Sequence, residues 1–391
     1  MAELTQHIEM QMSLLLFTAL GGYLISSWMR QPGVVGQILL GLVIGPSVLG
    51  WVTYTDFVAN VATLGAVILL FVTGLEFKLR EIVSVRYAVI ALSGVIVPWA
   101  GGYLLAIGFG FDPGKAILLG VALTATSIAI TADVLRELGK LQTETAKAII
   151  GAAILDDILA LLALSVSIQM GDGSFTMSMV MQSVIAAVLF LVVGAVMGIW
   201  VFGRLISRVD ETEFAKSYPD FVFAAVMMIA FFYAMVAEMI GLSAIVGAFV
   251  AGVSMEAVTL RNSRSFREGA EYLRIVFGSI FFISLGVLAD IRAFDSELIW
   301  FTLALTAMAI ATKLIGCGLP AWMMGTKLKD SLIIGVGMMP RGEVAMVVAL
   351  LALQGGVIAQ PAYVAIVLMS LLTTLIVPLL LRNWLYREKE N

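Results

Sequence analysis

Residues 148–166 read AIIGAAILDDILALLALSV, an apolar stretch of helix length with two adjacent carboxylates, Asp156 and Asp157, near its centre. A charge at the centre of a membrane helix costs at least about 2.5 to 3.5 kcal/mol by insertion scales, so charges in such a place indicate function. Because successive helical residues point about 100° apart, the two aspartates cannot share one face. The stretch therefore predicts a membrane helix that presents one carboxylate to a partner side chain and the other to a water-filled cavity.

The whole chain has the composition of an integral membrane protein. Its 391 residues are 61% hydrophobic and only 13% charged, whereas about a quarter of the residues in a soluble domain are charged. This balance excludes soluble enzymes and nucleic-acid-binding proteins. The single cysteine, Cys317, excludes an internal disulfide framework and a cysteine-based metal site. The single histidine, His7, excludes a histidine-rich zinc or haem site, and no cofactor is expected.

Thirteen apolar segments of helix length follow one another along the chain. A bilayer core about 30 Å thick needs roughly 20 residues per helical crossing. The segments lie near residues 9–29, 33–50, 58–77, 84–110, 114–136, 144–168, 177–207, 219–238, 240–256, 272–290, 298–322, 329–353 and 360–384. These runs are continuous and rich in glycine, unlike the alternating ten-residue strands of a membrane barrel. The sequence predicts an all-α membrane protein with thirteen transmembrane helices.

The basic residues set the orientation of these helices. With the N-terminus outside, the cytoplasmic loops and the C-terminal tail hold nineteen of the 23 Lys and Arg residues. Basic residues close to the ends of membrane helices resist translocation. We therefore expect a multi-pass protein of a prokaryotic cell (inner) membrane, with its N-terminus outside and its C-terminus in the cytoplasm.

Two parts of the sequence resemble each other at a distance of seven helices. Gly41 and Gly45, in ILLGLVIGPS, correspond to Gly247 and Gly252, in AIVGAFVAGVS. LLFVTGLEF, residues 69–77, corresponds in the same way to FFISLGVLAD, residues 281–290. An odd shift gives the two copies opposite orientations in the membrane. Inverted repeats are typical of secondary transporters, whose ion sites lie near the midplane where discontinuous helices meet.

The fifth and twelfth segments pair under this repeat, and polar residues interrupt both. The fifth, residues 120–135, reads GVALTATSIAITADVL, and the twelfth, residues 335–348, reads GVGMMPRGEVAMVV. Pro340 lacks a backbone donor, so it favours a break in the twelfth helix. Two such breaks that cross would bring helix N-termini and C-termini together. Asp133, Arg341 and Glu343 could compensate the partial charges at this crossing.

The eleventh segment carries a lone Lys313 near its centre, and we expect one of the adjacent aspartates to meet it. Carboxylate oxygens suit small hard cations such as Na⁺, and the same oxygens can hold a proton. Hydroxyl groups of Thr126 and Ser127, or carbonyls freed by the break in the fifth helix, could complete the shell of such an ion. Occupancy of one site by either H⁺ or Na⁺ is the physical requirement for exchange.

Structural roles remain open for several of these residues. Asp133 could be a hydrogen-bond partner within the helix packing, and Lys313 could be a fixed counter-ion or a proton carrier. Arg341 and Glu343 are better explained as structural compensation than as ion ligands. Cys317 and the Gly41–Gly45 pair are most simply explained by packing.

Taken together, the motifs resemble a known family. The phrases GQILLGLVIGP, LLFVTGLEF, ATSIAITADVL, ILDDILAL, GAFVAG, FFISLGVLAD and GMMPRGEVA, with the Lys313 segment, are similar to bacterial and archaeal sodium/proton antiporters of the monovalent cation:proton antiporter-2 family. The resemblance covers almost the whole chain. ILDD and PRGE together are its most specific part.

The resemblance implies a division of labour along one transmembrane domain, residues 1–391. A scaffold and dimerisation bundle would comprise 9–77 and 219–290, an ion-transporting core 84–168 and 298–384, and a linker helix 177–207. Asp157 would be the principal cation and proton site, and Asp156 would form a switchable salt bridge with Lys313. The paired aspartates imply electrogenic exchange of two protons for one sodium by a homodimer. The chain ends soon after its last apolar segment, so a cytosolic nucleotide-binding domain is not expected.

The sequence thus predicts a non-enzymatic transporter whose substrates are Na⁺ or Li⁺ and H⁺, moved by alternating access in a lipid bilayer. A potassium/proton exchanger of the same architecture is the first alternative. A sodium-coupled organic-solute symporter is the second, because an organic anion could sit at the half-helix N-termini. A channel fits the buried Asp and Lys residues less well, and a sensor that transports nothing would leave the cost of these charges unexplained.

Overall fold

In the computed structural model, helices joined by turns and loops are formed by the residues that it describes. These are residues 8–29, 31–76, 84–140, 142–170, 177–240, 242, 244–263, 265–290, 292 and 296–386. Among them, eight helices are long and apolar enough to cross a membrane: Ile8–Met29, Asp56–Leu75, Val85–Gly108, Val188–Asp210, Phe221–Met239, Phe266–Leu288, Leu298–Met323 and Gln360–Leu385. The prediction of an all-helical membrane protein is confirmed.

The chain divides into two compact units, each made of two separate stretches. The first unit comprises Met1–Leu79 and Ser174–Leu288, and the second comprises Arg80–Gly173 and Ala289–Asn391. The stretches expected to form a scaffold fall in the first unit, apart from residues 289–290, together with the expected linker, residues 177–207. The stretches expected to form the ion-transporting core fall in the second unit.

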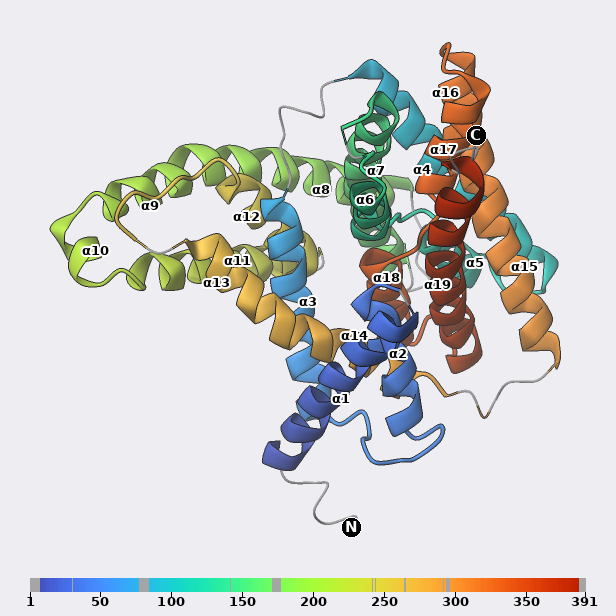
Figure 1. Cartoon of the computed structure of the whole chain (residues 1–391), viewed down its shortest axis with the longest axis horizontal. Coiled ribbons are helices and arrows are strands. Elements are labelled where there is room, and N and C mark those ends of the chain that lie inside the picture. The colour runs from blue at the N-terminus through green and yellow to red at the C-terminus, as the bar shows by residue number, and fades with distance from the viewer. Residues whose placement is uncertain are drawn as a thin grey trace, which may run out of the picture. The chain divides into compact units, whose positions relative to one another are not determined.

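The first unit is built from ten α-helices and two π-helical turns in its described part. They are α1 (Ile8–Met29), α2 (Gly33–Ile44), α3 (Asp56–Leu75), α8 (Met177–Met197), η3 (Gly198–Phe202), α9 (Gly203–Asp210), α10 (Glu213–Ser217), α11 (Phe221–Met239), α12 (Ala244–Met255), α13 (Phe266–Leu273), η4 (Arg274–Gly278) and α14 (Ser279–Leu288). In this unit α3 packs on α12, and α2 packs on α14 (Figure 1).

Glycines make both of these contacts close. A Cβ atom on Gly252 of α12 would overlap the carbonyl oxygen of Phe71 and lie 2.9 Å from the Cα atom of Gly74 in α3. A Cβ atom on Gly286 of α14 would overlap a carbonyl oxygen of α2 in the same way. Under the repeat predicted from the sequence, the α3–α12 and α14–α2 contacts are equivalent. The repeated glycines therefore lie where backbone meets backbone.

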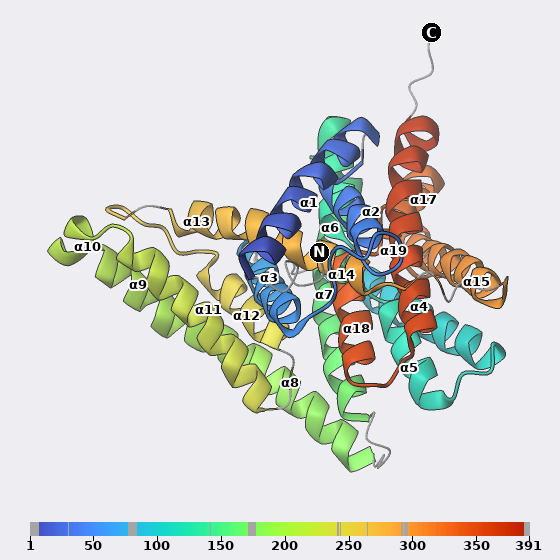
Figure 2. The same cartoon turned by 90° about the horizontal axis from the view of Figure 1, so that it is seen from below.

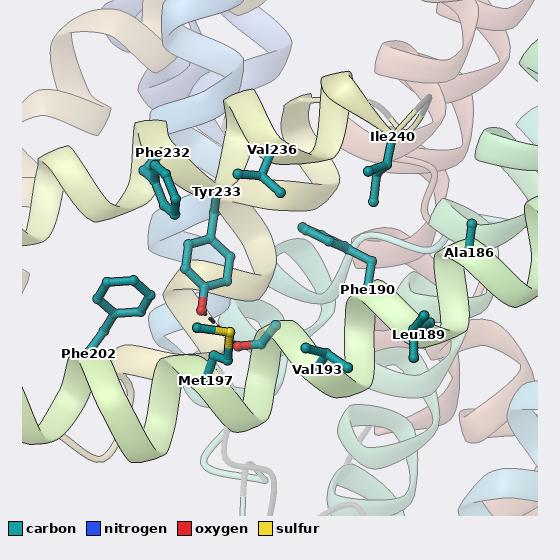
Figure 3. Close-up of a pocket in the computed structure, with 11 residues that line it drawn as sticks. Ala186, Leu189, Phe190, Val193, Met197, Phe202, Phe232, Tyr233, Val236 and Ile240 are labelled. Atoms are coloured by element: carbon teal, nitrogen blue, oxygen red, sulfur yellow. Dashed lines mark hydrogen bonds between the residues drawn. The ribbon is translucent and has the colours of Figure 1, made fainter.

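An apolar pocket of about 340 Å³ lies between α8 and α11 in the first unit. Figure 3 shows aromatic and aliphatic side chains around it, with the Tyr233 hydroxyl pointing to α8. That hydroxyl donates a 2.8 Å hydrogen bond to the Gly194 carbonyl. The pocket is lined by Ala186, Leu189, Phe190, Val193, Gly194, Met197, Phe202, Phe232, Tyr233, Val236 and Ile240, so it offers no ionisable group other than this phenol.

The second unit contains the segments with the interrupted patterns. Its described helices are α4 (Val85–Gly108), α5 (Pro113–Ala122), α6 (Ile128–Glu137), α7 (Glu144–Met170), α15 (Ser296–Lys313), α16 (Leu319–Met323), α17 (Leu328–Gly337), α18 (Glu343–Gln354) and α19 (Gln360–Leu380), with π-helical turns η6 (Leu314–Gly318) and η7 (Leu381–Leu385). Figure 2 gives a second view of α4, α15 and α19. In this unit α15 packs extensively against both α4 and α19.

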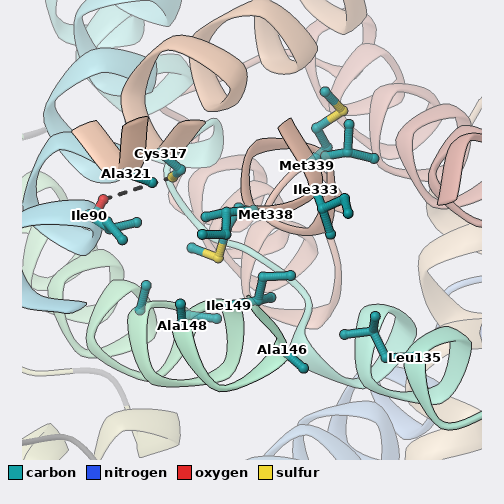
Figure 4. Close-up of a cluster of buried hydrophobic side chains, with 14 of the residues drawn as sticks. Ile90, Leu135, Ala146, Ala148, Ile149, Cys317, Ala321, Ile333, Met338 and Met339 are labelled. Atoms are coloured by element: carbon teal, nitrogen blue, oxygen red, sulfur yellow. Dashed lines mark hydrogen bonds between the residues drawn. The ribbon is translucent and has the colours of Figure 1, made fainter. Parts of the chain in front are cut away.

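The core of the second unit joins helices that are distant in sequence. Ile90 of α4, Ala146 and Ile149 of α7, Cys317 of η6 and Ile333 of α17 are all buried in one apolar cluster (Figure 4). Alanine is frequent in this cluster, which lets the helices approach one another closely. The cluster lies beside the polar groups described below and holds the helices that carry them.

Two predicted boundaries are wrong. The helix expected over 272–290 begins at Phe266, where the Ser265 side chain caps it by accepting from the Glu268 N–H. The segment expected to be helical over 33–50 forms helix only as far as Ile44, and Gly45 is extended, with φ −69° and ψ −180°. Gly45 precedes Pro46, and a residue before proline disfavours the α conformation. At 12 residues, α2 is shorter than the roughly 20 residues that a bilayer crossing needs.

Candidate functional site

Two helix interruptions lie in the middle of the expected fifth and twelfth segments. α5 ends at Ala122 and α6 begins at Ile128, while α17 ends at Gly337 and α18 begins at Glu343. Pro340, between α17 and α18, has no N–H with which to continue the helix of the twelfth segment. In the first interruption the Thr124 hydroxyl donates to the Val121 carbonyl at 2.7 Å, which satisfies a carbonyl at the helix end.

The two interruptions bind to each other. The Ser127 N–H donates to the Pro340 carbonyl at 2.8 Å. The Thr131 hydroxyl donates to the Gly337 carbonyl at 2.6 Å, at the C-terminal end of α17. Backbone groups left without a helical partner are costly inside a membrane, so these bonds stabilise the breaks. A Cβ atom on Gly342 would overlap the side chain of Ser127, so only glycine fits there without displacement.

Arg341 fills the space between the interruptions and has no exposed surface. Its guanidinium donates to the carbonyls of Thr124 at 3.3 Å, Ala125 at 2.9 Å and Ala309 at 3.2 Å. The first two carbonyls follow the C-terminus of α5, where the helix dipole is negative. Arg341 therefore places a positive charge beside the C-terminus of α5.

The backbone of Arg341 is held by α19. Its N–H donates to the Thr373 hydroxyl at 3.2 Å, and its carbonyl accepts from the Thr374 hydroxyl at 3.2 Å. Both threonines are buried. These two residues and the Ala309 carbonyl did not emerge from the sequence, because an isolated Thr-Thr pair in an apolar helix carries no signal of its partner.

Asp156 and Lys313 form a fully buried ion pair. The Lys313 Nζ atom lies 2.9 Å from each carboxylate oxygen of Asp156, and both side chains are 0% exposed. The Thr126 hydroxyl donates to Asp156 Oδ2 at 2.6 Å and lies 3.2 Å from the Met338 carbonyl. A single threonine thus links the carboxylate to both helix interruptions.

The structure brings together four of the residues proposed from the sequence: Asp156, Lys313, Thr126 and Arg341. Ser127 joins them through its backbone bond to Pro340, and its side chain is buried. The backbones of Asp133, Asp157 and Glu343 lie in α6, α7 and α18, but their side chains lie outside what the structure describes. Among the described side chains, no group of three His, Cys, Asp or Glu residues could hold a metal ion.

The chemistry of this arrangement follows from its burial. A paired and hydrogen-bonded charge is tolerated in a low-dielectric interior, whereas an isolated one is not. The carboxylate here has an ammonium and a hydroxyl as partners, so it can exist ionised without water. Loss of either charge would leave the other uncompensated, and this couples the protonation of Asp156 to that of Lys313.

A family model described as "Sodium/hydrogen exchanger, transmembrane" matches residues 15–385. The chain belongs to the sodium/hydrogen exchanger family. Members of this family are transporters rather than enzymes, which agrees with the expectation drawn from composition.

Curated relatives of this exchanger align over nearly its full length. The Na(+)/H(+)-K(+) antiporter GerN of Bacillus cereus is 36% identical over 375 residues, which cover 94% of this chain and 94% of GerN. A Na(+)/H(+) antiporter of Enterococcus hirae is 32% identical over 381 residues, which cover 97% and 98% of the two chains. The resemblance to bacterial sodium/proton antiporters is confirmed.

A solved structure shares the fold of this exchanger. The sodium proton antiporter MjNhaP1 of Methanocaldococcus jannaschii superimposes with a TM-score of 0.72 at 16% identity, covering 96% of this chain and 95% of that one. At this identity the match establishes the fold alone.

Proposed function

We propose that this exchanger is a secondary antiporter that moves Na⁺ or Li⁺ out of the cell in exchange for H⁺. The observation that carries the proposal is the buried Asp156–Lys313 pair, with its 2.9 Å contacts, in a chain of the sodium/hydrogen exchanger family. Two charges retained inside a membrane helix bundle need a functional explanation. Reversible protonation of such a pair supplies one.

In this proposal Asp157 is the group that binds the cation or the proton. Asp156, the residue before it, forms the switchable salt bridge with Lys313. Carboxylate oxygens bind small hard cations, and hydroxyl or carbonyl oxygens complete the shell. Thr126 and Ser127 lie at the interruption beside Asp156 and are the proposed additional ligands. One site that holds either a proton or a cation, but never both, gives obligatory exchange.

Exchange of two protons for one sodium would use both the pH gradient and the membrane potential. One pH unit contributes about 1.4 kcal/mol per proton. A potential of 100 mV adds about 2.3 kcal/mol per net charge moved. Electrogenic exchange could therefore expel sodium against a considerable gradient. The second proton would come from the Asp156–Lys313 pair, whose protonation states are coupled.

The proposed architecture has thirteen transmembrane helices, with the N-terminus outside, and works by alternating access. The bonds between the two interruptions support crossing of the fifth and twelfth segments. In this scheme the second unit is the mobile core. Residues 9–77 and 219–290 form the scaffold of a homodimer, and 177–207 links the scaffold to the core. Arg341, Asp133 and Glu343 compensate charges at the crossing and do not bind the transported ion.

Potassium is a second candidate substrate, favoured by one specific observation. GerN, 36% identical to this chain, is named as a Na(+)/H(+)-K(+) antiporter. The same oxygen ligands accept K⁺ when the site is larger, because selectivity among hard cations depends on cavity size and ligand number. Potassium could thus replace either the sodium or the protons in the exchange.

The test is cation-driven proton flux in sealed proteoliposomes. We expect Na⁺ or Li⁺ to drive proton movement, competition by K⁺ to define selectivity, and the rate to depend on voltage when the potential is left free. Asp157→Asn should abolish exchange, while Glu238→Gln, which alters an exposed acid near the end of α11, should not. Robust exchange by Asp157→Asn, or sodium uptake without proton counterflow, would refute the proposal.

A further inference from the structure

The helix that carries Lys313 changes its winding directly after this residue. α15 ends at Lys313, and Leu314–Gly318 form the π-helical turn η6, in which the Leu319 N–H donates to the Leu314 carbonyl five residues earlier. π-helical turns are rare and occur frequently at functional sites. One extra residue in a turn rotates the side chains before it by about 100° relative to those after it. The turn therefore sets the direction in which Lys313 projects.

Pro320 favours a wider turn at this point. In a regular α-helix the N–H of residue 320 would donate to the carbonyl of Gly316, but proline has no N–H and its ring clashes with that carbonyl. A wider turn relieves the clash and leaves the Gly316 carbonyl without its usual donor. Inside a membrane such a carbonyl needs another partner.

Ser93 of α4 provides that partner. Its hydroxyl lies 2.6 Å from the Gly316 carbonyl oxygen and 2.7 Å from the Val89 carbonyl of its own helix. The approach is possible because glycine occupies position 316: a Cβ atom there would lie 2.8 Å from the Ser93 carbonyl oxygen and 3.3 Å from the Cα atom of Gly94. The hydroxyl bond and the close backbone contact together hold η6 against α4.

The same contact borders the ion pair. A Cβ atom on Gly94 would lie 3.7 Å from both Lys313 Nζ and Asp156 Oδ1, and 2.5 Å from the Cys317 sulfur. Cys317, in η6, is buried and lies 3.8 Å from the Ile90 carbonyl of α4 (Figure 4). Among the side chains that the structure describes, the ionisable groups that act on Lys313 are Asp156 from α7, Cys317 from η6 and Arg341 from the second interruption. The face of α4 at Ser93 and Gly94 thus borders the ion pair.

We propose that Ser93 is a positioning residue for the Asp156–Lys313 pair. It donates to the Gly316 carbonyl, which lacks the usual bond from the N–H of residue 320, fixes the π-helical turn, and thereby holds the Lys313 ammonium on Asp156. The effect on transport rests on the proposed antiport, whereas the effect on the turn does not.

The experiment compares Ser93→Ala with Ser284→Ala in the full-length chain. Ser284 is the control, because its hydroxyl also donates to a carbonyl of its own helix, that of Phe281, although Ser284 is buried and Ser93 is half-buried. Two readouts are combined: the labelling rate of Cys317, the single cysteine, by N-ethylmaleimide, and the pH profile of sodium-driven proton flux. The double variant Ser93→Ala/Pro320→Ala restores an N–H that can bind the Gly316 carbonyl.

We expect N-ethylmaleimide to label Cys317 several-fold faster in Ser93→Ala than in the wild type. We also expect the midpoint of the pH profile of sodium-driven proton flux to move toward alkaline pH in this variant. A loosened ammonium lets the carboxyl hold its proton to higher pH, and the loss of one hydrogen bond corresponds to a shift of about 0.5 to 1 pH unit. Ser284→Ala should change neither readout. The double variant should return both toward the wild type.

The outcomes separate the two proposals. If the wild type shows no sodium-driven proton flux, the proposed antiport fails, and the labelling rate of Cys317 still decides whether Ser93 holds the turn. If the wild type exchanges and Ser93→Ala labels like Ser284→Ala, Ser93 does not hold the turn. Faster labelling with an unchanged pH profile would show that the turn does not position Lys313, and this would also overturn the inference.

Discussion

The Lys313 ammonium lies 2.9 Å from both carboxylate oxygens of Asp156, and neither side chain has any exposed surface. The attraction between them offsets the cost of removing both charges from water only while both are present. Because one remaining charge is more costly than none, the pair can be tested by stability measurements without a transport assay.

Single substitutions in the pair should cost more than the double substitution. Lys313→Gln leaves a buried carboxylate without its counter-ion, and Asp156→Asn leaves a buried ammonium; we expect each to lower the free energy of unfolding by about 3 to 5 kcal/mol. The double variant leaves no unpaired charge and should cost clearly less than the sum. Reversible unfolding in mixed detergent micelles measures all three. Additive losses would show that the two side chains are not coupled.

Arg341→Lys should destabilise the second unit although the charge is kept. A lysine ammonium cannot reach the carbonyls of Thr124, Ala125 and Ala309 together, as the planar guanidinium does. With hydrogen bonds from charged donors contributing about 1.5 to 3 kcal/mol each, we expect a loss of about 2 to 4 kcal/mol in the free energy of unfolding.

The matched control for Arg341→Lys is Arg204→Lys. Arg204 is exposed, and its guanidinium lies 4.4 Å from the ring centroid of Trp200. A surface substitution of this kind should change stability by no more than about 0.5 kcal/mol. Equal effects of the two substitutions would mean that the hydrogen bonds of the Arg341 guanidinium contribute nothing to the free energy of unfolding.

Gly94→Ala should disturb the site, and Gly108→Ala on the same helix should not. The new methyl group at position 94 would lie 2.5 Å from the Cys317 sulfur, whereas nothing lies within 4 Å of a Cβ atom at position 108. Overpacking of this kind costs about 1 to 3 kcal/mol. We expect lower thermal stability and slower exchange for Gly94→Ala alone.

Cys317→Ala tests the cause of that effect. It removes the sulfur that the methyl group at position 94 would meet, so the Gly94→Ala/Cys317→Ala double variant should recover most of the lost stability. Failure to recover would place the clash elsewhere on α4.

Gly252→Ala should weaken the first unit. Its methyl group would overlap the Phe71 carbonyl oxygen and approach the backbone of Gly74, and backbone atoms cannot move aside as a flexible side chain can. Gly278→Ala is the control, because the nearest atom to its Cβ is the Arg274 Cγ atom at 3.5 Å, an ordinary contact. We expect a loss of more than about 1 kcal/mol for Gly252→Ala only, measured by unfolding in detergent. Similar losses for both would contradict the role of the repeated glycines.

Local chemistry predicted the parts of the site that depend on single residues. Lys313 could be paired with one of the two adjacent aspartates, because a buried charge in each of two apolar helices needs a partner. The choice of Asp156 came from the family resemblance. The interruption at Pro340 followed from the missing N–H. The sequence also placed Gly41 and Gly252 among repeated residues, although it did not show that such glycines mark backbone contacts.

Contacts that depend on tertiary structure could not be predicted in this way. The Ala309 carbonyl looks like that of any helical alanine, and only the fold brings it to Arg341. Ser93 is an ordinary helical serine, and its role depends on Pro320, which lies on another helix. The one signal in the sequence is that a glycine stands four residues before this proline, at position 316. Gly45 and Pro46 indicate the end of α2 at Ile44. The apolar run continues past these two residues, so hydrophobicity alone predicted a longer helix.

The bonds between the two helix interruptions also limit how the second unit can move. Ser127 holds the Pro340 carbonyl, Thr131 holds the Gly337 carbonyl, and Arg341 holds Ala125. Sliding one interrupted helix past the other would break all of these at once, at about 0.5 to 1.5 kcal/mol or more per bond. The two interrupted helices are therefore joined into one rigid body. Any displacement of α5 and α6 must move α17 and α18 with them.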